Sequence, residues 1–141
     1  MKILLLSGGA DSMLLFQTYP CDVTVFFDYG QQHLDKELSC CSDFVDEIIK
    51  LPPLTIRDKE VNCRNLCFII NLVSVFGYED LEIYIGTNAE DVYKDNSRDF
   101  YNEVEDFINK ISFYKVKVIT PLKDMTKNEI LKKLELTYYT D

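Results

Sequence analysis

The fold is decided near the start of the chain, in the stretch KILLLSGGADS (residues 2–12). Lys2 to Leu6 is a short, mostly apolar run and predicts a buried strand that leads directly into two glycines. Ser12 to Tyr19 carries four consecutive apolar residues and predicts a short helix. A strand, a glycine turn and a helix in this order form the unit from which parallel α/β sheets are built.

The turn between this strand and helix has the composition of a phosphate-binding loop. Gly8 and Gly9 let the backbone approach an anion closely, and the helix N-terminus directs positive dipole at it. Ser7 and Ser12 add hydroxyl donors, but no Gly-Lys-Ser/Thr follows, so this is not a Walker motif. Asp11 is unfavourable beside phosphates unless it holds Mg²⁺ or caps the helix. An ordinary turn with a capping aspartate is therefore the alternative.

Strands and helices alternate along the rest of the chain, which predicts one α/β domain over residues 1–141, a three-layer parallel sheet with helices on both faces. The secondary structure of Thr55 to Val61 is not decided by its residue pattern. Strands are predicted at Val23–Phe27, Glu82–Ile85 and Val116–Ile119. One helix is predicted at Asn65–Phe76, and a second along the apolar stripe Phe100, Val104, Phe107 and Ile111. A last helix is predicted to begin at the capping box Thr126–Glu129 and to run through Leu134.

One further helix is predicted from spacing alone. Its apolar stripe consists of Leu34, Leu38, Cys41, Val45 and Ile48, and Leu51-Pro52-Pro53 ends it. Three acidic residues lie off this stripe and are expected on a solvated face: Glu37, Asp43 and Glu47.

Charge and composition exclude several classes of protein. The formal net charge is -9, which disfavours nucleic acid and anionic membranes as partners. ATP stays compatible with it, because Mg²⁺ and backbone amides neutralise phosphate locally. The apolar run Ile3 to Leu6 is too short for a signal peptide or a membrane span, so we expect a cytoplasmic protein.

The cysteines predict neither disulfides nor a metal site. There are five, an odd number, and none forms a Cys-x-x-Cys pair. Cys63 and Cys67 are four residues apart, but without a second pair of ligands we expect no zinc.

The loop Ser7-Gly8-Gly9-Ala10-Asp11-Ser12 resembles the Ser-Gly-Gly-x-Asp-Ser signature of PP-loop ATP pyrophosphatases, whose fold is adenine nucleotide alpha hydrolase-like. Further segments resemble one family of these enzymes, the 7-cyano-7-deazaguanine synthases of queuosine biosynthesis. They are Phe27 to His33, Arg64-Asn65, Ile85-Gly86 with the stretch from Asp91 to Phe100, and Pro121-Leu122 followed by Thr126 to Ile130.

The resemblance implies a reaction and a set of site residues. ATP, with Mg²⁺, activates 7-carboxy-7-deazaguanine, ammonia forms the amide, and a second ATP drives dehydration to the nitrile. The implied catalytic residues are Asp11 (through Mg²⁺), Arg64 and Lys127. The implied nucleotide contacts are Ser7, Gly8, Gly9, Ala10, Asp11, Ser12, Phe27 and Gly86. The implied substrate contacts are Tyr29, Gln31, His33, Asn65, Asp91, Tyr93 and Asp95.

Several of these residues also have ordinary structural interpretations. Lys127 is compatible with a solvated first helical turn, and Arg64 with a surface charge. His33 is compatible with a local cap or a local pair, and Asp95 with the end of a turn.

The chain also departs from the family pattern. It lacks the family's cluster of zinc-binding cysteines, is shortened between Ile49 and Arg64, and has Lys94 and Asn96 where the family usually has proline and cysteine. A PP-loop ligase for another acceptor and a non-catalytic nucleotide-binding module therefore stay open. Tyr138 and Tyr139 suggest a homodimer, and a completing partner chain is the alternative.

Overall fold

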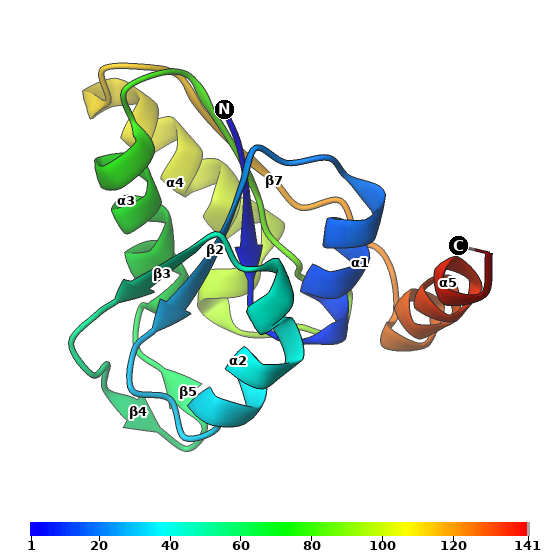
Figure 1. Ribbon diagram of the computed structural model, residues 1–141. Helices are drawn as coiled ribbons and strands as arrows, with labels where there is room; N and C mark the ends of the chain where they lie inside the picture. The colour runs from blue at the N-terminus through cyan, green and yellow to red at the C-terminus, as the bar shows by residue number, and fades with distance from the viewer. Residues whose placement is uncertain (141) are drawn as a thin grey trace.

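The computed structural model describes the backbone of residues 1–140 and the side chains of residues 1–135. Its centre is a parallel five-stranded sheet with strand order β3-β2-β1-β6-β7 (Figure 1). The strands are β1 (Lys2–Leu6), β2 (Val23–Asp28), β3 (Glu47–Lys50), β6 (Leu81–Tyr84) and β7 (Val116–Ile119). The helices are α1 (Ala10–Thr18), α2 (Leu34–Cys41), α3 (Arg64–Phe76), α4 (Arg98–Ile111) and α5 (Lys127–Thr140).

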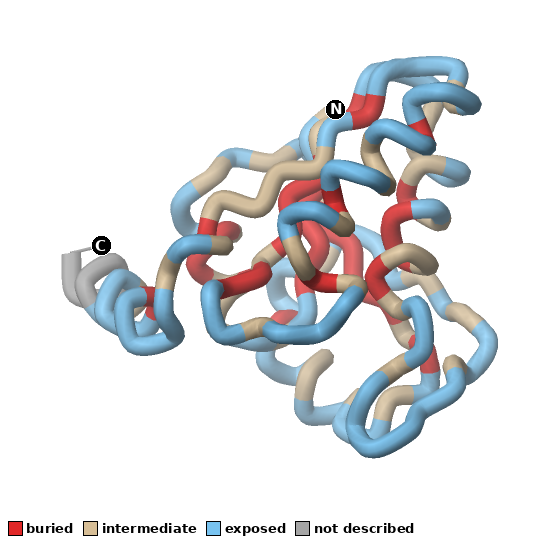
Figure 2. Tube along the Cα trace, turned by 180° about the vertical axis from the view of Figure 1, so that it is seen from behind, coloured by how far each residue is buried: buried red, intermediate tan, exposed pale blue. Residues whose placement is uncertain are grey.

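Two apolar cores lie on opposite faces of this sheet, because side chains alternate along each strand. On β1, Ile3 and Leu5 join one core with residues of α3 and α4. Leu4 and Leu6 join the other core, which contains residues of α1, α2 and α5. Buried positions are accordingly concentrated in the central strands and on the inner sides of the helices (Figure 2). The predicted three-layer architecture is confirmed.

The helix predicted from Leu34 to Ile48 is wrong in its second half. α2 ends at Cys41, a short 3-10 turn follows, and residues Glu47–Lys50 form the edge strand β3. Asp46 accounts for the change, since its carboxylate accepts from the backbone N–H of Thr24 at 2.9 Å and its own N–H donates to Thr24 Oγ1 at 2.9 Å. These bonds hold the chain against β2, so the helical spacing of Val45 and Ile48 is coincidental.

The ambiguous segment and the predicted capping box are both resolved. Thr55 to Val61 contains a small hairpin, β4 (Ile56–Arg57) and β5 (Glu60–Val61), turned by Asp58 and Lys59 at φ 50° and 69°. Thr126 and Glu129 form the reciprocal bonds of a capping box at the start of α5, with 3.3 Å for each backbone N–H to the partner's side chain. Among the described residues, no helix is long and apolar enough to cross a membrane.

Candidate functional site

The candidate site lies at the carboxyl ends of the central strands. The strand order places β1 between β2 and β6, so the connections after β1 and β6 leave on opposite sides and open a crevice between them. Five of the six buried polar side chains in the described part of the chain lie in the loops and helix starts at this edge: Ser12, Asn65, Thr87, Asn88 and Asn96. Buried polar groups need partners, so their concentration here marks a built site.

The loop after β1 has the geometry of an anion cradle. Gly8 has φ +80°, and a Cβ there would stand 2.3 Å from the carbonyl oxygen of Glu37, so only glycine fits. The Ser12 hydroxyl, at the start of α1, accepts from Ser7 N–H at 3.2 Å and donates to Gly9 C=O at 3.2 Å. Ser7 and Gly9 are exposed, and no side chain caps α1, so its first amides are open to a ligand.

Asp11 is held in place by one oxygen only. Its Oδ2 accepts from Asn88 Nδ2 at 2.8 Å, whereas Oδ1 is buried without a hydrogen-bond partner. Because α1 has no side-chain cap, the alternative of a capping Asp11 is wrong. Burial raises the pKa of Asp11, as do the nearby carboxylates Asp91 and Glu90, while Asn88 and Lys127 lower it.

These features fit a magnesium ion shared with phosphate. The described residues contain no cluster of three or more His, Cys, Asp or Glu side chains able to hold a metal by themselves. Mg²⁺ commonly binds one or two carboxylates together with the phosphates of its nucleotide. Asp11 Oδ1, a buried anionic oxygen without a partner, is the ligand that such an ion would take.

Gly86, just after β6, brings the second loop against the first. A Cβ at Gly86 would lie 3.0 Å from the backbone of Asp11 and Ser12. The absence of a side chain therefore lets the β6 loop contact the start of α1 closely.

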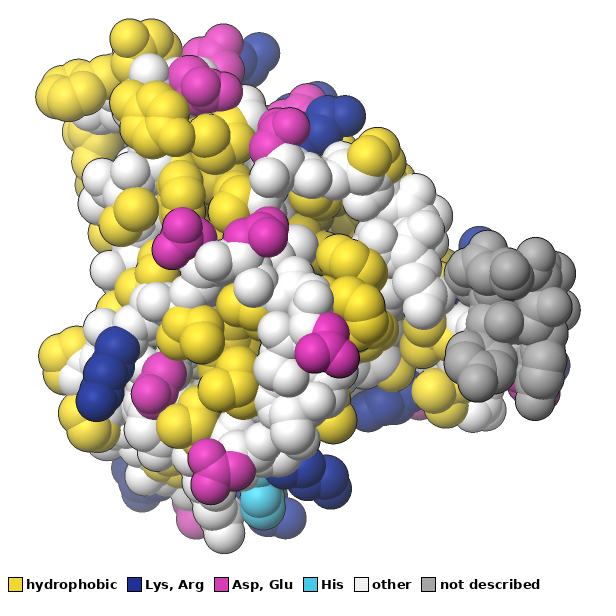
Figure 3. Space-filling model, viewed as in Figure 1, with side chains coloured by type: hydrophobic (Ala, Val, Ile, Leu, Met, Phe, Trp, Pro, Cys, Tyr) yellow, Lys and Arg dark blue, Asp and Glu magenta, His cyan; other side chains and the backbone are white. Residues whose placement is uncertain are grey.

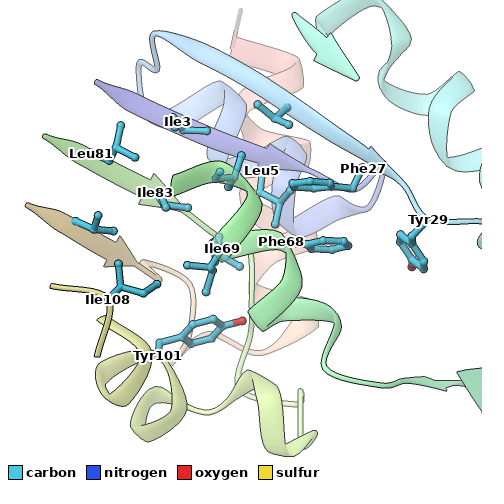
Figure 4. Packing of buried hydrophobic residues seen from close by; sticks show 14 residues of the cluster. Ile3, Leu5, Phe27, Tyr29, Phe68, Ile69, Leu81, Ile83, Tyr101 and Ile108 are labelled. Atoms are coloured by element: carbon cyan, nitrogen blue, oxygen red, sulfur yellow. The ribbon is translucent and has the colours of Figure 1, made fainter. Parts of the chain in front are cut away.

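A pocket of about 110 Å³ opens beside the glycine loop that follows β1. It brings together eight residues predicted from the sequence: Ser7, Ser12, Phe27, Tyr29, Gln31, Arg64, Asn65 and Gly86. An aromatic wall supports it, with Phe27 stacked on Phe68 at a centroid distance of 4.4 Å and Tyr29 tilted against Phe68 at 5.5 Å (Figure 4).

Arg64 is a pocket residue and not a surface charge. Its guanidinium donates to Tyr29 Oη at 3.3 Å and lies 5.9 Å from the centroid of the Phe68 ring. This leaves a cation facing the pocket at the first residue of α3. Gln31 is also in the wall, where its side-chain amide bridges Phe27 C=O (3.0 Å) and Tyr29 N–H (2.9 Å) and so fixes the turn after β2.

The loop after β6 organises a second group of predicted residues. Asp91 accepts from Thr87 Oγ1 at 3.1 Å and from Asn88 N–H at 2.9 Å. Asn65 donates its backbone N–H to Asp95 Oδ2 at 3.2 Å and its side-chain amide to Asp95 C=O at 2.8 Å. Asp95 therefore joins the loop to the start of α3.

Four other predicted residues also lie outside the 110 Å³ pocket: Tyr93, Asp95, His33 and Lys127. Tyr93 and Asp95 line a separate, smaller depression on the other side of Arg64. His33 is exposed and makes no capping bond at the start of α2, so the capping alternative does not hold. Lys127 is exposed at the start of α5, where its backbone N–H donates to Glu90 Oε2 at 2.9 Å and its charge lowers the pKa of Asp11.

Two further site residues were not identified from the sequence. Glu37 was expected on a solvated face, which is wrong: it lines the pocket, and burial raises its pKa against the opposing effects of Arg64, His33 and Gln31. Its place in the first turn of α2, the helix that follows the Asp28-Tyr29-Gly30 turn, was the available signal.

Lys123 follows β7 and binds the β6 loop with its ammonium group. The group donates to the carbonyls of Asn96 (2.8 Å), Asn88 (3.1 Å) and Asp91 (3.2 Å), and lies 3.4 Å from Thr87 Oγ1. No sequence motif marks a lysine that acts through main-chain carbonyls.

The strand order and the glycine loop after β1 define the class: this is an α/β protein with a PP-loop-like fold. The family model described as "Queuosine biosynthesis protein QueC" matches residues 47–139, which is 93 of the 141 residues. The chain belongs to this family, the 7-cyano-7-deazaguanine synthases, and the resemblance seen in the sequence is confirmed. A search of curated proteins found no match.

Proposed function

We propose that this protein uses ATP, Mg²⁺ and ammonia to convert 7-carboxy-7-deazaguanine into 7-cyano-7-deazaguanine. Family membership supports an enzyme of queuosine biosynthesis. The observation that carries the finer proposal is the position of Asp11, which presents a buried, unpartnered oxygen beside an open phosphate cradle.

The chemistry requires a carboxylate to be made electrophilic. Its oxygen attacks the α-phosphate of ATP and pyrophosphate leaves; ammonia then displaces AMP and gives the amide. The amide oxygen then attacks the α-phosphate of a second ATP and a second pyrophosphate leaves; loss of AMP, which carries that oxygen, together with the N–H protons gives the nitrile. The enzyme must hold two anions together and neutralise charge at the α-phosphate, which is a task of positioning and electrostatics.

Residues in different parts of the site would perform different parts of this task. In the proposal, the amides of Gly8 to Ser12 hold the phosphates, and Asp11 holds Mg²⁺, which neutralises phosphate charge when bound. Arg64 faces the pocket and neutralises the substrate carboxylate or the α-phosphate. Lys127 adds positive charge beside Asp11.

The purine-like edge of the substrate meets the aromatic and amide wall. Tyr29, Asn65 and Gln31 line the pocket, and Asp91, Tyr93 and Asp95 shape the loop next to it. Phe27 and Gly86 supply the close, apolar contact surface for the nucleotide.

Mass spectrometry of a reaction with ATP, Mg²⁺, 7-carboxy-7-deazaguanine and ¹⁵N-labelled ammonium tests the proposal. We expect a nitrile product that carries the heavy isotope, together with AMP and pyrophosphate. Asp11→Asn serves as the inactive control. Pyrophosphate release without any labelled product would overturn the assigned substrate.

One observation favours a second candidate, a ligase for a different carboxylate. Asn96 lines the pocket and is only 8% exposed, and it occupies a position where the family often has cysteine. Burial raises the pKa of Tyr101, so its hydroxyl stays protonated and donates to Asn96 Oδ1 at 2.5 Å. Pyrophosphate release with other purine-like carboxylates would identify this case, whereas no release with any acceptor would indicate a nucleotide-binding module.

A further inference from the structure

The proposed reaction needs a group that binds ammonium and removes a proton from it. At neutral pH ammonia in water is mostly the ammonium ion, which has no lone pair and cannot attack an activated carboxyl carbon. A general base within hydrogen-bond reach of the nitrogen meets this need. A carboxylate suits the task, because it attracts the cation through a charge-assisted hydrogen bond before it accepts the proton.

Glu37 is the one acidic side chain, among the residues that the structure describes, that lines the 110 Å³ pocket. Carboxylates elsewhere are ordinary on this acidic chain, and Figure 3 shows them at several separate places on the face viewed. Asp91 and Asp95 lie near the site but accept the hydrogen bonds that shape the β6 loop. Glu37 forms no ion pair in the described part of the chain, so its carboxylate is available to a cation.

The backbone of Glu37 is fixed against the glycine loop. Its N–H donates to His33 C=O at 2.9 Å in the first turn of α2, and its carbonyl oxygen accepts from Cys41 Sγ at 3.4 Å. The same carbonyl lies where a side chain at Gly8 would stand. The carboxylate therefore enters the pocket beside the loop that would hold the phosphates of ATP, which is where the acyl-adenylate would form.

Arg64 and Glu37 give the pocket one positive and one negative group. Neutral partners hold Arg64, because its guanidinium donates to Tyr29 Oη at 3.3 Å and lies over the Phe68 ring. In the proposed function the substrate carboxylate would lie against Arg64. The ammonium ion would then have Glu37 as its counter-charge, so each reactant would have an opposite charge in the pocket.

The surroundings of Glu37 suit a base that works near neutral pH. Burial raises its pKa, while Arg64 on α3, His33 at the start of α2 and a hydrogen bond from Gln31 lower it. A general base is most effective when its pKa approaches the operating pH. A cavity of about 10–15 Å³ admits one water. The pocket, at about 110 Å³, therefore has room for an ammonium ion beside the reacting carboxyl group.

We propose that Glu37 holds ammonium in this pocket and takes a proton from it, so that ammonia attacks the activated carboxyl carbon. This role rests on the proposed function. One proton passes from ammonium to the Glu37 carboxylate. The nitrogen lone pair then forms the C–N bond, the C–O bond to AMP breaks, and AMP leaves with that electron pair. A second proton passes from the nitrogen to the AMP phosphate, and Glu37 returns its own proton to water.

The scheme uses charged residues of a single copy of the chain, Arg64 and Glu37. The homodimer suggested by Tyr138 and Tyr139 is not required for it, and those two side chains lie outside the described residues. The experiments therefore use the whole chain in whatever state it adopts.

Two half-reactions separate the role of Glu37 from the proposed function. Exchange of labelled pyrophosphate into ATP, dependent on 7-carboxy-7-deazaguanine, measures adenylation and needs no ammonia. We expect Glu37→Gln to keep this exchange and to lower kcat/KM for ammonium about 100-fold or more, the scale of general base catalysis. Asp35→Asn is the matched control, since Asp35 is exposed in the same helical turn and lies outside the pocket. It should equal the native chain in both assays.

Hydroxylamine and pH give readouts that a merely structural role would not change. Hydroxylamine is a weaker base than ammonia and is mostly unprotonated at neutral pH, so Glu37→Gln should form the hydroxamate at close to the native rate. Its deficit with ammonium should shrink as pH rises and free ammonia becomes abundant. Glu37→Asp should recover part of kcat/KM for ammonium. Circular dichroism shows whether each variant stays folded.

Each failure has a different pattern. A folded Glu37→Gln variant with native kcat/KM for ammonium, or with an equal loss for ammonium and hydroxylamine, would overturn the role of Glu37 and leave the proposed function standing. An equal loss of pyrophosphate exchange and amide formation would place Glu37 in adenylation and also overturn it. A native chain without substrate-dependent exchange would overturn the proposed function and this inference together.

Discussion

Substituting Asp11 by asparagine should separate catalysis from stability. Asparagine keeps the shape of the side chain and an oxygen that can accept from Asn88, so the contact between the two loops survives. It removes the negative charge on the buried, unpartnered oxygen. The variant therefore loses the proposed magnesium ligand while it keeps the local structure.

The structure fixes the direction of both effects. Burial raises the pKa of Asp11 in the folded state, so this group favours folding below its unfolded pKa and that contribution is lost as pH rises through the folded pKa. Asn has no charge to bury, so the Asp11→Asn variant does not lose this stability at neutral pH. The amide nitrogen that replaces Oδ1 stays buried without a partner, so only the desolvation cost of the charge is recovered, and we expect an equal or slightly higher Tm.

Turnover should change in the opposite direction. Losing one electrostatic stabiliser of a transition state costs about 100-fold or more in rate. Pyrophosphate release and Tm measured on the same preparation give both values. Asp22→Asn is the control, because the exposed Asp22 also accepts a backbone hydrogen bond, from Lys2 at 2.7 Å, far from the site. A stable Asp11→Asn protein with near-normal pyrophosphate release would remove Asp11 from the mechanism.

Three other substitutions test the supporting structure. Lys123→Met should raise KM for the substrate about 10-fold and lower Tm, because three loop carbonyls lose their charged donor. Lys123→Arg should recover part of both effects, and equal KM values for Lys123→Met and the native chain would refute a positioning role. Gly8→Ala should destabilise the fold by about 2 kcal/mol or more in chemical denaturation, because of its positive φ and the Glu37 carbonyl, and an unchanged midpoint would contradict the loop geometry. Since burial raises the pKa of Glu37, Glu37→Gln should gain stability relative to the native chain as pH rises from 4 to 7 (about the range in which a raised carboxyl titrates), which a series of melting curves can follow.

The sequence predicted the parts of the structure that depend on neighbouring residues. The strand, glycine turn and helix over residues 2–19 form a local unit, and the capping box at Thr126 involves residues only three apart. The apolar composition of Asn65–Phe76 likewise predicted α3, which begins one residue earlier at Arg64. Local signals sufficed because each of these features is stabilised within a short segment.

Features that depend on distant contacts could not be predicted in this way. β3 replaces a helical turn because Asp46 pairs with Thr24, 22 residues earlier in the chain. Lys123 reaches carbonyls from 27 to 35 residues away, and Glu37 enters the pocket only because α2 packs against Gly8. Helical spacing gives no information on such pairings.

Two independent parts of the chain support the same site. The family match begins at residue 47, so the glycine loop at residues 7–12, the proposed phosphate site, lies outside it. The match contains Arg64, Asp91 and Lys127, and the fold brings these to the edge of the sheet where the loop lies. If the resemblance of either segment were due to chance, there would be no reason for the glycine loop and the matched residues to lie side by side in the fold.

The charges around this edge explain why an acidic protein would bind an anionic nucleotide only together with cations. Asp11 is surrounded by Glu90 and Asp91, which raise its pKa, and Glu37 lines the neighbouring pocket. A bare polyphosphate would be repelled by these carboxylates at the distances of a binding site. Arg64 and Lys127 offset part of that repulsion, and a magnesium ion at Asp11 would offset the rest. In the proposed function, these carboxylates would therefore favour the magnesium complex of the nucleotide over the free nucleotide.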